Sequence, residues 1–165
     1  MDRLFARGTV TIDAPADEVF AVVADPVAMA GLAAELQSVR WLDGAAEAAL
    51  GARFEGLNRH GRRSWRTVCE VVELRPGRSF GYDVATGFGV PISRWRYDVE
   101  PAGDGTCVVT ETNWARIPVW FVPLALAVTG TINRPALNRA NIATTLDRLK
   151  ARMENRPSEE ARPAS

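Results

Sequence analysis

The hydrophobic pattern divides the first 36 residues into one strand and two short helices. Apolar residues alternate with polar ones over residues 4–12, the period-two pattern of a half-buried strand. A helix is predicted next, because Asp13 comes just before Pro15 and acids fall in the following turn. The Asp-Pro pair at 25–26 ends that helix, and residues 27–36 predict a second one.

The middle of the chain predicts strands separated by turn residues. Gly, Pro and Asn or Asp fall between the apolar stretches, and the connections are too short for parallel crossovers. The predicted strands are 39–42, 52–60, 64–74, 79–85, 92–100 and 106–115. With the first strand they make an antiparallel meander of seven strands.

The end of the chain predicts one long amphipathic helix over residues 135–153. Ile142, Leu146, Leu149 and Met153 form a single apolar stripe at helical spacing. The only partner large enough for this stripe is the concave face of the sheet. We therefore predict an α+β fold in which a seven-stranded antiparallel sheet wraps around a long C-terminal helix.

Length and composition predict one domain over residues 1–153. The chain has 165 residues, 47% hydrophobic and 24% charged, which are the proportions of a globular domain. Residues 154–165 contain two prolines, several charges and no large apolar side chain, and they predict a disordered tail.

Charge and motifs narrow the classes of function. Twenty basic and twenty acidic residues balance, so the long-range field that nucleic-acid binding needs is absent. The N-terminus carries no apolar run of a secretory signal, which predicts a cytoplasmic protein without a transmembrane segment. Cys69 and Cys107 lack metal-site spacing and are read as buried hydrophobes. No motif predicts a cofactor or a metal.

Five stretches of the chain are characteristic: VTIDAPADEVFAVV at 10–23, FEGLNRHGRRSW at 54–65, RWRYDVEP at 94–101, TET at 110–112 and NRANIATTLDRLKA at 138–151. In their order along the chain they resemble the START-like (SRPBCC) superfamily, specifically its polyketide cyclase/dehydrase branch and its actinobacterial members. The resemblance covers residues 3–155 and implies a helix-grip fold. It also implies a cavity between sheet and helix for a lipid, sterol, polyketide or quinone, but no single reaction, since many members only bind.

Strand alternation selects the side chains that face this cavity. They combine aromatic rings with small and polar groups, which is typical of a binding pocket, although the same side chains can also fill a solid core. The candidates on the strands are Phe54, Asn58, Trp65, Thr67, Phe80, Tyr82, Trp95, Tyr97, Val109, Glu111 and Asn113, and those on the final helix are Asn138, Arg139 and Ile142.

Glu111 is the most consequential candidate, and alternation leaves its direction open because both faces of its strand carry apolar residues. The resemblance favours an inward Glu111, which then needs a cation, water or a raised pKa. Arg139 shares a helix stripe with Ile142 and is the predicted partner; alternatively Arg139 extends into solvent and Glu111 faces outward. Tyr97, Glu111 and Arg139 are the candidates for catalysis.

Residues 117–130, which begin with Ile117 and end with Gly130, carry no charge. The segment is too short to span a bilayer. It predicts a cavity lid with Trp120 and Phe121 against the ligand, a surface that touches a membrane, a dimer contact, or a piece packed over the sheet. Monomer and homodimer both stay open.

Binding or transport of a small hydrophobic ligand is the function that the sequence favours. It carries no nucleophile elbow, phosphate loop or zinc-protease motif, and its one histidine, His60, falls at a predicted turn. The alternatives are a polyketide cyclase, aromatase or dehydrase that uses the same cavity, and a module that contacts a partner or a membrane.

Overall fold

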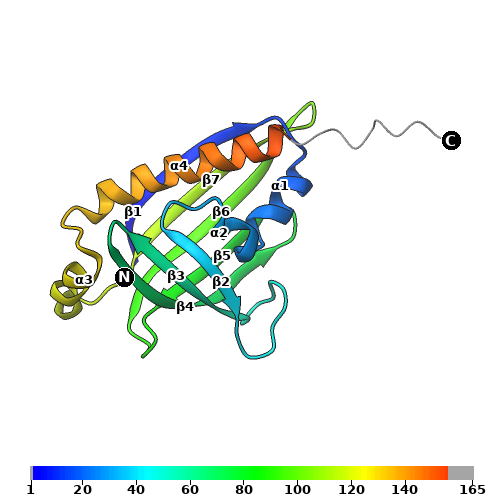
Figure 1. Ribbon diagram of the computed structural model, residues 1–165. Helices are drawn as coiled ribbons and strands as arrows, with labels where there is room; N and C mark the ends of the chain where they lie inside the picture. Colours follow the sequence, from blue (N-terminus) through cyan, green and yellow to red (C-terminus); the bar gives the residue numbers. More distant parts are fainter. Residues whose placement is uncertain (1, 156–165) are drawn as a thin grey trace.

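The computed structural model describes residues 2–155, and its centre is a strongly curved antiparallel sheet (Figure 1). In this part of the chain seven strands pair in the order β1-β7-β6-β5-β4-β3-β2. The strands are β1 (Arg3–Ile12), β2 (Leu36–Trp41), β3 (Arg53–His60), β4 (Arg63–Arg75), β5 (Ser79–Ala85), β6 (Pro91–Gly103) and β7 (Thr106–Ala115). The predicted meander is confirmed, and β1 joins it beside β7.

Two short helices follow β1: α1 (Ala16–Val23) and α2 (Pro26–Ala30). Asp25 caps α2, because its Oδ1 accepts hydrogen bonds from the backbone N–H of Val27 at 3.0 Å and of Ala28 at 3.3 Å. The second helix is shorter than predicted. It ends before Gly31, a poor helix former, and the chain then enters β2.

The long helix α4 (Arg134–Glu154) lies across the open side of the sheet (Figure 1). Its buried stripe includes Ile142, Leu146 and Leu149. The helix approaches β1 closely at Gly8, where an added Cβ would lie 2.5 Å from Ile142 Cγ2. This contact lets the sheet close around α4, and the predicted α+β helix-grip fold is confirmed.

The end of α4 corrects the predicted start of the tail. Glu154 lies in the last turn, where its Oε1 accepts a hydrogen bond from the backbone N–H of Asp13 at 2.9 Å. This bond joins the end of the helix to the end of β1, so the ordered chain includes residue 154. Residues 156–165 lie outside the described part, and the rest of the tail prediction stays a prediction.

A short 3₁₀ helix, η1 (Val119–Phe121), and the helix α3 (Val122–Thr129) connect β7 to α4. Figure 1 shows α3 at the opposite end of the sheet from α1 and α2. Gly130 ends α3 with a φ of 71°, a left-handed conformation that glycine adopts without strain. The chain can therefore turn sharply there and enter α4.

Candidate functional site

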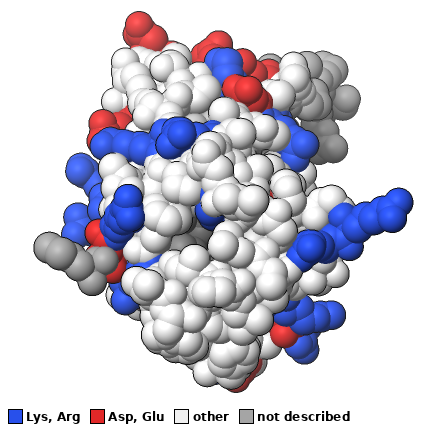
Figure 2. All heavy atoms as spheres, turned by 90° about the vertical axis from the view of Figure 1, so that its left-hand side faces the viewer, with Lys and Arg blue, Asp and Glu red and all other residues white. Residues whose placement is uncertain are grey.

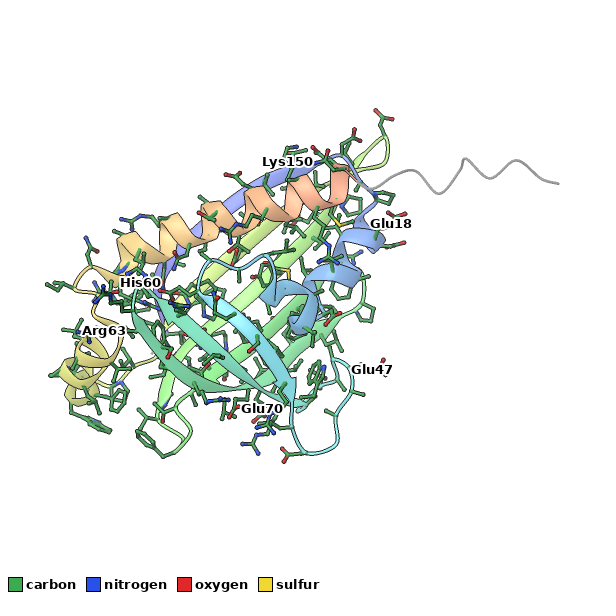
Figure 3. The ribbon with its side chains drawn as sticks, in the orientation of Figure 1. Glu18, Glu47, His60, Arg63, Glu70 and Lys150 are labelled. Atoms are coloured by element: carbon green, nitrogen blue, oxygen red, sulfur yellow. The ribbon has the colours of Figure 1, made fainter. Side chains whose placement is uncertain are left out.

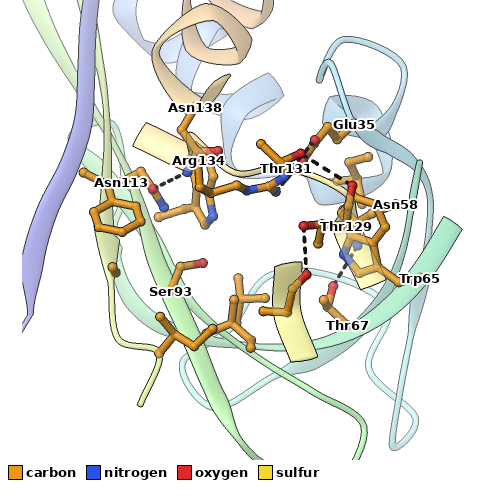
Figure 4. Close-up of a pocket in the computed structure, with 18 of the residues that line it drawn as sticks. Glu35, Asn58, Trp65, Thr67, Ser93, Asn113, Thr129, Thr131, Arg134 and Asn138 are labelled. Atoms are coloured by element: carbon orange, nitrogen blue, oxygen red, sulfur yellow. Dashed lines mark hydrogen bonds and ion pairs between the residues drawn. The ribbon is translucent and has the colours of Figure 1, made fainter. Parts of the chain in front are cut away.

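A cavity of about 490 Å³ lies between the concave face of the sheet, the start of α4 and the η1–α3 segment (Figure 4). Its lining is mostly apolar, with polar side chains at separate points. Figure 2 views the molecule from the end where α3 lies, and it shows a hollow in that face. The cavity therefore has a buried inner end on the sheet and a mouth beside α3.

The sheet provides an aromatic wall. Phe54, Trp65, Tyr82, Trp95 and Tyr97 come from four neighbouring strands, and all of them line the cavity. The ring centroids of Phe54 and Tyr82 lie 5.3 Å apart in an edge-to-face arrangement, which aromatic pairs prefer. Alternation along each strand predicted this wall, because side chains two residues apart share a face.

Glu111 points inward and is buried at the inner end of the cavity, with 3% of its surface exposed. It pairs with Tyr97 in the β6–β7 register, and the Tyr97 hydroxyl donates a hydrogen bond to Glu111 Oε1 at 2.9 Å. Burial raises the pKa of Glu111 to about 8, although the hydrogen bond from Tyr97 acts in the opposite direction. The carboxyl group is therefore mostly protonated at neutral pH.

Asn138, not Arg139, is the α4 residue at the inner end. Arg139 is exposed and does not line the cavity, so its predicted ion pair with Glu111 is wrong. Both residues lie about one turn before Ile142, but on different sides of its stripe. The helix turns the Asn138 side toward the sheet, where Asn138 Nδ2 donates a hydrogen bond to Asn113 Oδ1 at 2.7 Å (Figure 4).

The other candidates divide between the cavity and the solid core. Asn58, Thr67, Asn113, Phe121 and Asn138 line the cavity with the residues already described. Like Arg139, four other candidates do not line the cavity, and their prediction is corrected: Phe80, Val109 and Ile142 are buried in the apolar core, and Trp120 is 72% exposed.

An ion pair at the mouth was not predicted from the sequence. Arg134, at the start of α4, donates two hydrogen bonds to the Glu35 carboxylate at 2.6 and 3.1 Å (Figure 4). The Arg134 guanidinium also lies 5.8 Å from the centre of the Trp65 ring, and His60 Nδ1 lies 3.5 Å from Glu35 Oε1. Residues so far apart along the chain carry no local signal of their pairing.

The η1–α3 segment covers the mouth, and Phe121 of η1 is its one buried side chain. Val122, Leu124, Ala125 and Leu126 line the cavity, yet α3 has no buried residue. Arg63, from the start of β4, donates a hydrogen bond to the Ala127 carbonyl near the end of α3 (Figure 3). No helix within residues 2–155 has the length and hydropathy of a membrane span.

The outer surface of the mouth is apolar. Phe88 is 73% exposed, Val119 87% and Ile132 93%, and all three lie at or beside the η1–α3 segment or the cavity. In Figure 2 the lower half of the face with the hollow is largely uncharged, and Lys and Arg side chains lie mainly around its margins. We call the set Phe88, Val119, Trp120, Leu124, Val128 and Ile132 the mouth patch.

Comparison with known proteins shows the family to which the chain belongs. The model of the family described as polyketide cyclase / dehydrase and lipid transport matches residues 6–154. No curated protein matches the sequence significantly.

Three solved structures show the same fold. A polyketide-cyclase-like protein from Corynebacterium glutamicum is 25% identical, with a TM-score of 0.54 and coverage of 94% of this chain and 91% of that chain. A protein from Deinococcus radiodurans is 20% identical, with a TM-score of 0.63 and coverage of 90% and 96%. The di-domain aromatase/cyclase StfQ of the steffimycin pathway is 14% identical, with a TM-score of 0.65; the match covers 91% of this chain and 50% of StfQ. The chain belongs to the polyketide cyclase/dehydrase and lipid-transport family.

Proposed function

We propose that this protein binds or carries a small, largely apolar molecule in the cavity between sheet and helix. The observation that supports the proposal is the cavity itself, about 490 Å³ with an aromatic and aliphatic lining. An empty apolar cavity of that size would cost on the order of 10 kcal/mol, at roughly 24 cal/mol per Å³. That is comparable with the whole stability of a domain, so a ligand or water is expected to fill it.

Two measurements test this proposal. Native mass spectrometry of gently purified protein is expected to show a co-purifying small molecule. After its removal, the fluorescent probe N-phenyl-1-naphthylamine is expected to bind the cavity. A clean mass spectrum together with no probe binding would contradict the proposal.

A matched pair of variants tests whether the fluorescent probe binds inside the cavity. Ser93 lines the cavity, whereas Val72 is 37% exposed on the same sheet and lines no part of it. Ser93→Phe is expected to fill the cavity and weaken probe binding at least tenfold, while Val72→Phe leaves binding unchanged. Equal effects of the two substitutions would place the probe elsewhere.

Catalysis of a cyclisation or dehydration is the second candidate, and the buried Tyr97–Glu111 pair favours it. Because Glu111 is mostly protonated at neutral pH, it can give its proton to a ketone oxygen of the ligand as an enol carbon attacks that carbonyl. The enol hydroxyl then loses its proton to the carboxylate, and the acid is restored. The similarity to the di-domain aromatase/cyclase StfQ supports this candidate at the level of fold alone.

Glu111→Gln tests the catalytic candidate, since glutamine keeps a hydrogen-bond donor but cannot transfer a proton. A reactive poly-β-ketone mimic is expected to give a changed product distribution, and slower turnover, with the variant. The same products at the same rate from both proteins would leave the binding role and exclude catalysis through Glu111.

Contact with a membrane is the third candidate, and the mouth patch supports it. Three exposed arginines in or beside the β3–β4 turn, Arg59, Arg62 and Arg63, have no carboxylate partner within residues 2–155. Arg63 contacts α3 directly. Apolar side chains beside unpaired cations are the combination that anionic membrane surfaces attract. Such contact would let an apolar ligand enter without crossing water.

A further inference from the structure

Two buried oxygen atoms at the inner end of the cavity have no hydrogen-bond partner. They are Glu111 Oε2 and Asn138 Oδ1, on side chains of residues that are 3% and 4% exposed. Within residues 2–155 they are the buried side-chain polar atoms left unpaired, and both residues line the cavity. Buried polar groups are usually paired, so these two atoms indicate a missing partner.

The neighbouring hydrogen bonds fix which atom of each side chain is left. The Arg94 carbonyl can only accept, so Asn113 presents its Nδ2 there, at 3.2 Å, and its Oδ1 toward α4. Asn138 must then donate its Nδ2 to Asn113 Oδ1, which leaves Asn138 Oδ1 as an acceptor. The Tyr97 hydroxyl donates its hydrogen bond to Glu111 Oε1, which leaves Glu111 Oε2 without a partner.

The two unpaired oxygens belong to one small region. Glu111 and Asn113 are two residues apart on one face of β7, roughly 7 Å between their Cα atoms. Asn138 is bonded to the second of them. Elsewhere on the lining, Asn58 is paired with Thr67 and Arg134 with Glu35. The two buried oxygens without a partner therefore lie together at the inner end, where a polar group of a ligand can bind them.

The surroundings of Glu111 favour its protonated form. The titratable side chains that face it are Tyr97 on β6 and Tyr82 on β5, and Cys69 on β4 lies beyond Tyr82. None is a cation, and α4 contributes the neutral Asn138. Burial raises the pKa of Glu111, Tyr97, Tyr82 and Cys69. Glu111 Oε2 therefore carries a proton to donate, while Asn138 Oδ1 accepts.

We propose that the inner end of the cavity recognises a ligand with a carbonyl and a hydroxyl group on one apolar ring system. The ligand carbonyl accepts a hydrogen bond from Glu111 Oε2, and the ligand hydroxyl donates one to Asn138 Oδ1. The ring system lies against Trp95, Tyr82 and Phe54. This assignment rests on the proposed function, because it supposes that a ligand occupies the cavity.

Four bicyclic probes of nearly equal size test the assignment. 4-Hydroxy-1-tetralone has both groups, too far apart to bond to each other; 1-tetralone has the carbonyl, 1-tetralol the hydroxyl, and tetralin neither. Displacement of N-phenyl-1-naphthylamine measures their affinities. The hydroxyketone is expected to bind at least tenfold more tightly than either single-group probe, because each of those leaves one buried oxygen unpaired.

Three variants assign each group to its residue. Glu111→Leu is expected to abolish the advantage of the carbonyl, Asn138→Leu that of the hydroxyl, and Glu111→Gln, which keeps a donor, to retain both. Tetralin serves as the internal control, because its affinity is expected to change less than threefold in every variant. An equal loss of tetralin and hydroxyketone binding in Glu111→Leu and Asn138→Leu, with the fold retained, would show that neither side chain acts on a polar group of the ligand and would overturn the assignment.

The outcome separates this inference from the proposed function. If N-phenyl-1-naphthylamine binds and the four bicyclic compounds displace it with equal affinity, the cavity binds ligands and the inference is wrong. If neither the fluorescent probe nor tetralin binds, the proposed function fails. Thermal unfolding of each variant confirms that the fold is retained before affinities are compared.

Discussion

The inner end and the mouth of the cavity are built in opposite ways. At the inner end Tyr97, Glu111, Asn113 and Asn138 are all at most 4% exposed and are joined by hydrogen bonds. At the mouth, α3 has no buried residue and its apolar side chains face the cavity or solvent. The proposed recognition therefore lies on buried, hydrogen-bonded side chains of the sheet and α4, and the proposed access lies beside the segment with the fewest buried residues.

This division has an energetic basis. Moving the inner residues would break the register of β6 and β7 and leave buried polar atoms without partners. Displacing α3 would expose little that is not already exposed and would break few bonds, such as that from Arg63 to Ala127. Segments with few buried contacts open at low free-energy cost, so we expect ligands to enter beside α3.

The largest difference in stability is expected between alanine variants of two phenylalanines that both line the cavity, one buried against the sheet and one at the mouth. Phe54 is 1% exposed and packs between Trp41 and Tyr82, whereas Phe88 is 73% exposed. Phe54→Ala is expected to lower the free energy of unfolding by about 3–5 kcal/mol, and Phe88→Ala by less than about 1 kcal/mol. Urea unfolding measures both. Similar losses would mean that the mouth is part of the cooperative core.

The next effect is the pH dependence that the buried Glu111 confers. Its pKa is raised to about 8 in the folded protein from an ordinary value of 4.5, so the unfolded chain releases the proton first. The contribution of Glu111 to the free energy of unfolding is therefore greatest below pH 4.5. It falls as pH rises toward 8, by at most about 1.4 kcal/mol per pH unit.

Comparison with Glu111→Gln isolates this contribution, because other carboxylates titrate equally in both proteins. The difference in unfolding free energy between variant and wild type is expected to rise in favour of the variant between pH 5 and 8. A difference that does not change with pH would show that Glu111 is ionised and solvated in the folded protein.

Removal of the Tyr97 hydroxyl is expected to have a smaller effect. Tyr97→Phe leaves both Glu111 oxygens without a protein donor and is expected to cost about 1–3 kcal/mol. It is also expected to raise the pKa of Glu111 further, since the hydrogen bond from Tyr97 lowers it. Tyr82→Phe is the matched control, because the Tyr82 hydroxyl makes no hydrogen bond to residues 2–155. Equal costs would mean that the Tyr97–Glu111 bond is not stabilising.

The sequence predicted the sheet side of the cavity well and the helix side less well. Strand alternation has two directions only, so the turns and aromatic positions were enough to place Trp95 and Tyr97 on the inner face. On α4, neighbouring residues differ by about 100° around the axis, and the choice between Asn138 and Arg139 depends on how the helix is rotated against the sheet. That rotation is set by close packing at Gly8, which no local pattern records.

The smallest effect on stability is expected at the mouth patch, where a membrane is the proposed partner. Trp120 is 72% exposed and does not line the cavity, so Trp120→Ala is expected to change the free energy of unfolding by less than about 0.5 kcal/mol. Tryptophan favours the membrane–water interface, so the same substitution is expected to weaken binding to phosphatidylglycerol-containing vesicles severalfold. Leu50→Ala, which changes a 66% exposed apolar residue outside the mouth patch, is the control in vesicle flotation. Absence of binding to any vesicle, with a change from dimer to monomer in Trp120→Ala, would show that the mouth patch contacts a second copy of the chain instead.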